Sequence, residues 1–209
     1  MPRKKTFSFK NLIHKNFRRL EQFIFLLKSL LTPRQFIYLS CVLVGISSAL
    51  AVIILKTFAH WVFKSSQKLD DILHLPFSNS TLPIIGIIIT VIIIKKVLDG
   101  SIEKGTSQIM YAVAKKRGIM PRKQMFAQII TSSFTVGMGG SAGLESPITI
   151  TGAAFGSNYA QNYRLSYKDR TLLIGCGVAA GISAAFNAPI AGVLFAVEVL
   201  LVDVSISAF

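Results

Sequence analysis

The stretch GGSAGLESPITITGAAFG, residues 139–156, combines a glycine-rich loop with the start of a helix. Its glycines permit a tight loop that exposes backbone N–H groups, and Ser146 and Pro147 begin a helix whose positive end faces that loop. Such a helix start attracts anions, because its first N–H groups have no partner within the helix. The stretch therefore predicts an anion site at this junction.

The same stretch carries a negative charge of its own, since Glu145 is the only acidic residue between Lys104 and Lys168. A carboxylate within a membrane is costly and is by default a hypothesis for function. The alternative is an acid that only stabilises the helix start, by about 0.3–1 kcal/mol. We favour the functional interpretation: the carboxylate competes with a permeant anion for the same N–H groups and acts as a gate, opened by protonation or by displacement.

The surrounding sequence is typical of a membrane protein. Hydrophobic residues make up 52% of the chain, and the segments 36–55, 124–144, 146–163 and 171–197 contain no Lys, Arg, Asp or Glu. A spanning helix needs about 20 apolar residues, so the first and last of these segments are long enough. Pro147 and Pro189 each open a new apolar run, which indicates broken helices around a buried site.

The distribution of positive charge favours a membrane over nucleic acid as the partner of this chain. The net charge is +14, with nine of the 23 basic residues before position 35 and eight more from Lys95 to Lys123. We interpret this as the positive-inside pattern around two crossings, at about 35–64 and 82–98, with a cytoplasmic N-terminus and lipid as a partner. Residues 1–32 form a basic segment that we interpret as an amphipathic helix on the membrane surface, and a disordered tail leading into that helix is the alternative for residues 1–18.

No pattern in the sequence indicates an enzyme, a metal or a cofactor. Cys41 and Cys176 lie in separate apolar segments and are interpreted as small packing residues. His14, His60 and His74 are scattered, and the glycine-rich loop lacks the lysine of a phosphate-binding loop. Gly177 and Gly181 have the spacing that lets membrane helices approach closely.

Two motifs carry a resemblance to a known family. GLESP at 143–147, followed by GAAFG at 152–156, resembles the gating-glutamate motif of the CLC chloride channels and chloride/proton exchangers. AAGISAAFNAPIAGVLFAVEVL at 179–200 is very similar to a helix pair of the same family. The resemblance implies an all-α integral membrane protein and a homodimer with one pore per subunit. Residues 33–209 would be the transmembrane anion-transport domain, the first of two inverted repeats, with the chain stopping at Phe209 about where one repeat would end.

The resemblance also implies roles for particular residues. Glu145 would be the gate, and the anion would lie against the backbone at Gly143, Leu144, Ser146, Pro147 and Ile148. Leu144 stands where an arginine is frequent in the family, and Ser146 where a glycine is frequent. A second anion-binding stretch would contain Lys104, Gly105 and Thr106, with Lys104 at the place of a serine. Lys104 is either a solvated charge at the pore mouth or a residue that draws anions in.

The last helix bears on the choice between a channel and an exchanger. Family exchangers commonly have two acids there, and in this chain Glu198 matches the first while Val199 stands at the second, the proton acceptor. We therefore expect channel-like chloride transport. The alternatives are a chloride/proton antiporter with another proton route, a cation-coupled solute transporter, and a membrane-anchored structural or nucleic-acid partner that uses the basic N-terminus. Glu198 itself is expected to be structural.

Overall fold

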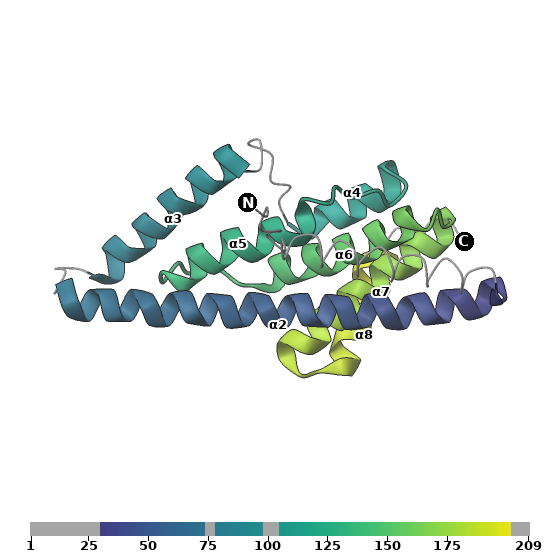
Figure 1. The fold of residues 1–209 in the computed structure, drawn as a ribbon, viewed down its shortest axis with the longest axis horizontal. Coiled ribbons are helices and arrows are strands. Elements are labelled where there is room, and N and C mark those ends of the chain that lie inside the picture. The colour runs from purple at the N-terminus through teal and green to yellow at the C-terminus, as the bar shows by residue number, and fades with distance from the viewer. Residues whose placement is uncertain (1–29, 74–77, 98–104, 202–209) are drawn as a thin grey trace, which may run out of the picture. The chain divides into compact units, whose positions relative to one another are not determined.

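The computed structural model of the chain describes residues 30–73, 78–97 and 105–201. Within these ranges there is no strand, which confirms the all-α expectation. Residues 1–29, His74 and Lys104 lie outside the described residues. The helices are α2 (Pro33–Leu73), α3 (Ser78–Val97), α4 (Ser107–Lys115), α5 (Gln124–Gly137), α6 (Glu145–Asn162), α7 (Tyr167–Phe186) and α8 (Pro189–Leu201), labelled in Figure 1.

The chain divides into two units, residues 1–40 and residues 41–209. The described part of the first unit contains the start of α2. There the amide of Thr32 donates to Oε1 of Gln35 at 3.1 Å, and the amide of Gln35 donates to Oγ1 of Thr32 at 3.5 Å. This reciprocal pair satisfies amides that the helix itself leaves unpaired, and Pro33 fits the first helical position because it has no N–H group.

In the second unit, α6 and α7 pack with their backbones in contact. A Cβ on Gly152 would collide with the carbonyl oxygen of Gly177, and a Cβ on Gly177 would collide with that of Gly152. One turn along α6, a Cβ on Gly156 would collide with the carbonyl oxygen of Leu173. Gly152, Gly156 and Gly177 are therefore required at one helix interface, whereas a Cβ on Gly181 would meet no atom closer than 3.4 Å.

The part of α2 in this unit packs against three other helices. Val52 and Leu55 are buried in a cluster with Ile148 of α6 and Ile182 of α7. Further along α2, the hydroxyl of Ser66 donates to the carbonyl of Gly137, at the end of α5, at 3.2 Å. A long helix thus runs from the α6–α7 pair to α5 and supports both sides of the loop that precedes α6.

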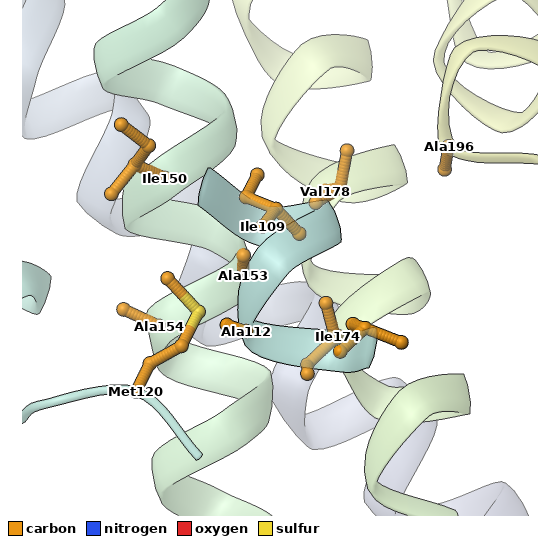
Figure 2. Packing of buried hydrophobic residues seen from close by; sticks show 10 residues of the cluster. Ile109, Ala112, Met120, Ile150, Ala153, Ala154, Ile174, Val178 and Ala196 are labelled. Atoms are coloured by element: carbon orange, nitrogen blue, oxygen red, sulfur yellow. The ribbon is translucent and has the colours of Figure 1, made fainter. Parts of the chain in front are cut away.

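Helix α4 is held by a cluster of small and branched side chains. Figure 2 shows Ile109 and Ala112 of α4 among Ile150 and Ala153 of α6 and Ile174 of α7. All five of these side chains are at most 1% exposed. Alanines on facing helices leave room for the isoleucines, so α4 sits directly on the α6–α7 pair.

One helix boundary differs from the expected one. The first crossing was expected to end near residue 64, but α2 continues to Leu73. The hydroxyl of Ser65 donates to the carbonyl of Trp61 at 2.9 Å, so this polar side chain is satisfied inside the helix. The break expected before Pro189 is present: α7 is capped at its end by Asn187, whose φ of 54° is left-handed, and a new helix starts at Pro189.

Length and composition make two of the described helices candidates for crossing a membrane, the segment Pro33–Asp71 of α2 and Tyr167–Phe186, which is α7. The first agrees with the expected crossing near 35–64. The second crossing, expected at 82–98, falls on α3 and stays a prediction.

Candidate anion-binding site

The loop between α5 and α6 makes a tight reversal that requires glycine. Gly139 has a φ of 90°, in the left-handed region that favours glycine. The amide of Gly140 donates to the carbonyl of Thr135 at 2.9 Å, and a Cβ on Gly140 would lie 2.5 Å from that oxygen. A Cβ on Gly143 would meet nothing within 4 Å, so this residue borders open space. The glycines of GGSAG therefore turn the chain sharply and leave the next helix start uncovered.

Helix α6 begins at Glu145, whose side chain is exposed. The amides of Glu145 and Ser146 have no acceptor within the described part of the chain, and Pro147 has no N–H group. The amide of Ile148 already donates to the carbonyl of Leu144 at 3.0 Å. Of the backbone groups expected to bind the anion, the amide of Ser146 is thus available, while the amide of Ile148 serves the helix. The amide of Glu145, which was not in the expected set, is available as well.

The side chain of Leu144 faces the protein interior. It is half-buried and packs against the cluster that contains Leu55, Ile148 and Ala185. An arginine at this position would have to place its guanidinium group in an apolar cluster or turn away from it. In this chain Leu144 can therefore contribute to an anion site through its backbone, and its side chain anchors the loop.

The start of α4, which follows Gly105 and Thr106 of the expected second anion-binding stretch, lies beside the start of α6. The amide of Met120, in the link after α4, donates to Oγ of Ser157 at 3.0 Å, and Oγ of Ser157 donates to the carbonyl of Gly118 at 2.6 Å. This fixes the end of α4 beside the second half of α6, whereas Ile109 near the start of α4 clusters with Ile150 near the start of α6. The two helices run parallel.

Gly105 and Thr106 therefore lie toward the end of the molecule where α6 starts. Gly105 has a φ of 80°, and Thr106 caps α4 without a hydrogen bond from its side chain. Both residues are half-buried. Two helix N-termini, those of α4 and α6, thus point the same way, an arrangement in which their positive ends reinforce each other.

Lys56 is a charged residue near this end that was not singled out from the sequence. Its ammonium group donates to the carbonyl oxygen of Ala185, in the last turn of α7, at 2.6 Å. Ala185 and Leu55, the residue before Lys56, belong to the same cluster as Ile148 of α6. The signal available in the sequence was its position, because Lys56 directly follows the charge-free segment 36–55.

The other residues considered from the sequence are dispersed. Glu198 is exposed on α8, and the side chain of Val199 lies outside those that the structure describes. The thiols of Cys41 and Cys176 are in hydrogen-bonding contact, which joins α2 to α7. Both thiols are free, and the two side chains pack against each other where α2 meets α7. No group of three or more potential metal ligands occurs among the described residues.

The chain is similar in sequence to a family of known membrane proteins. The family of voltage-gated chloride channels matches residues 85–209, more than half of the chain. Chloride channel protein CLC-c of Arabidopsis thaliana is 41% identical over 93 residues, 38% of this chain and 12% of that protein. The H(+)/Cl(-) exchange transporter ClcA of Yersinia pestis is 36% identical over 95 residues, 45% of this chain and 20% of that protein.

A third relative, the voltage-gated ClC-type chloride channel ClcB of Yersinia pseudotuberculosis, is 38% identical over 71 residues, 34% of this chain and 17% of that protein. The matched part thus spans one fifth or less of the length of each of these three curated relatives. No solved structure matches the chain. The family match covers α4 to α8 and includes the loop, the glutamate and the helix pair described above, and by this match the chain belongs to the voltage-gated chloride channel family.

Proposed function

We propose that this chain provides a pathway for chloride or a similar small anion in which Glu145 is the gate and conduction is channel-like. One observation carries the proposal: an exposed carboxylate stands at the start of α6 beside two backbone amides, at Glu145 and Ser146, that have no acceptor among the described residues. Amides of this kind bind anions, and the carboxylate and a chloride ion would compete for them.

The mechanism follows from this competition. An ionised Glu145 side chain can fold back onto the helix start, as a negatively charged side chain is stabilised there. A chloride ion can displace the carboxylate, or a proton can neutralise it, and either event frees the amides for the permeant ion. Gly143 borders open space two residues before the glutamate, and its lack of a side chain leaves that space unfilled.

The choice between a channel and an exchanger, the second repeat and the homodimer are proposed from the family resemblance. Val199 at the place of a proton acceptor favours a channel, because an aliphatic side chain carries no proton. A chloride/proton antiporter with another proton route is the second candidate, supported by the similarity to a protein named an exchange transporter. A second inverted repeat, a homodimer and contacts with membrane lipid would complete the pathway, since the chain spans a small part of its relatives' length.

The gate is tested in the full-length protein reconstituted into liposomes, with chloride flux measured from pH 4.5 to pH 8. Glu145→Gln is expected to raise flux at neutral pH and to flatten its pH dependence, because the amide resembles the protonated acid. Glu198→Gln is the matched control: it removes another exposed acid from the same unit. Equal pH profiles for Glu145→Gln and the wild type would refute the gate, and survival of flux without sodium would exclude cation coupling.

A further inference from the structure

Two short links lie side by side at the C-terminal end of α6. One link joins α4 to α5, and the other joins α6 to α7. The guanidinium group of Arg122, in the first link, donates to Oδ1 of Asn162, the last residue of α6, at 2.5 Å. Arg170, in the first turn of α7, donates to the carbonyl of Arg117 at 2.9 Å. The two links and the helix ends that they join therefore form one surface.

This surface gathers all of the cations of residues 105–186. We call these eight residues the basic end: Lys115, Lys116, Arg117, Arg122, Lys123, Arg164, Lys168 and Arg170. Seven of them are exposed, and Arg170 is half-buried. The same range holds two acids, of which Glu145 starts α6 and so lies away from this surface. The other, Asp169, accepts a hydrogen bond from the hydroxyl of Ser166 at 2.7 Å, so one carboxylate lies among eight cations.

The stability of the helices explains only half of these cations. A cation is favoured at the C-terminus of a helix and disfavoured at the N-terminus, where the partial charge of the helix is positive. Four of the eight follow this rule at the ends of α4 and α6. The other four lie at the starts of α5 and α7, where the rule disfavours them: Arg122, Lys123, Lys168 and Arg170. Proteins depart from such local rules mainly at functional sites, so these four cations indicate a bound anion.

The place of the basic end on α7 indicates which anion it meets. Helix α7 is a candidate membrane span, so its first turn would lie at the boundary between lipid and water. Large apolar side chains are exposed among the cations, namely Ile119, Phe126, Tyr167 and Leu172. Tyrosine is enriched at this boundary in membrane proteins. A partner that offers both a negative charge and hydrocarbon fits such a surface, whereas a free phosphate or a nucleic acid would leave the apolar side chains in water.

We propose that the basic end binds the headgroups of anionic phospholipids, with the exposed apolar side chains beside it in contact with the acyl chains. This inference goes beyond the proposed function and does not depend on the gate at Glu145. Clusters of about four to eight Lys and Arg beside a membrane helix are typical of surfaces that bind anionic lipid. A headgroup phosphate at the starts of α5 and α7 would be attracted by the lysines and by the helix dipoles together, which removes the conflict between them.

The test measures lipid binding to the purified full-length protein in a neutral detergent by native mass spectrometry. Phosphatidylglycerol and phosphatidylcholine with the same acyl chains are the probes, and the wild type should bind phosphatidylglycerol more tightly. Lys123→Gln combined with Lys168→Gln should raise the Kd for phosphatidylglycerol about 25-fold, about fivefold for each lysine, and leave that for phosphatidylcholine unchanged.

The matched control is Lys64→Gln combined with Lys68→Gln, which removes two exposed lysines of α2. These flank Ser66, whose hydroxyl donates to the carbonyl of Gly137 at the far end of α5 from the basic end. The control should keep the wild-type Kd. An equal rise in the control would show an effect of net charge and would overturn the proposal, as would equal Kd values for the wild type and the variant of the basic end.

Two further measurements separate the alternatives. Glycerol phosphate, which has the phosphate without acyl chains, should compete poorly with phosphatidylglycerol; if it competes at a similar concentration, the surface binds a free phosphate and the assignment to lipid is wrong. Thermal unfolding without added lipid tests for a structural role. The variant of the basic end should be at least as stable as the wild type, because cations leave the positive ends of two helices. A lower unfolding temperature would overturn the argument from the helix ends.

Discussion

Replacing Gly152 by alanine tests the backbone contact between α6 and α7. Within a helix alanine is favoured over glycine by about 1 kcal/mol, so in the absence of a clash the substitution would stabilise the protein. The new methyl group, however, would overlap the carbonyl oxygen of Gly177, and its carbon would lie 2.8 Å from the carbonyl carbon of that residue. Backbone atoms cannot rotate away as a side chain can, so the two helices must separate. Overpacking of this kind costs about 1–3 kcal/mol.

We expect Gly152→Ala to lower the free energy of unfolding by up to about 2 kcal/mol, the steric cost less the gain in helix propensity. The assay is unfolding of the full-length protein in mixed micelles of a mild detergent and dodecyl sulfate, followed by circular dichroism. Gly45→Ala is the control, because a Cβ on Gly45 would lie 3.8 Å from Cβ of Ala180, an ordinary contact between α2 and α7. It should be neutral or stabilising. If the Gly152→Ala and Gly45→Ala variants have the same free energy of unfolding, the backbone contact between α6 and α7 is refuted.

Two further predictions concern α2 and proton coupling. Mild oxidation with iodine should form a disulfide between Cys41 and Cys176, because the two thiols are already in contact. The thiols lose two protons and two electrons, the iodine is reduced to iodide, and the mass of the protein falls by about 2 Da. Cys176→Ser should abolish the cross-link, and a wild-type protein that never forms it would contradict the packing of α2 on α7. With Val199 in place of an acid, a chloride gradient should drive little or no uphill proton movement into vesicles with a pH-sensitive dye; stoichiometric pumping would mark an exchanger.

Features encoded by neighbouring residues could be predicted from the sequence. The helix start at Glu145 follows from glycines before it and a proline after it, and α8 begins at Pro189 as expected. The end of α2 was predicted too early, because serines read as a connection are satisfied inside a helix by carbonyls one turn back. Composition alone does not distinguish these two uses of serine.

Contacts between distant segments could not be predicted in the same way. The hydrogen bond between Lys56 and Ala185 joins positions 129 residues apart. The contact between Cys41 and Cys176 likewise depends on which face of α2 meets α7, and this is decided by where small residues allow close approach. In both cases the residue type was visible in the sequence, but its partner was determined by the packing of α2.

The packing of α2 also bears on how a gate can work with a leucine before its glutamate. Leu144 and Ile148 flank the first turn of α6, and both are held in the apolar cluster with Leu55. The backbone that presents the amides of Glu145 and Ser146 is thus fixed by burial, whereas the glutamate side chain is exposed. A rigid pair of donors beside an exposed carboxylate is what competition between the carboxylate and an ion requires, because the donors then keep their geometry whichever anion occupies them.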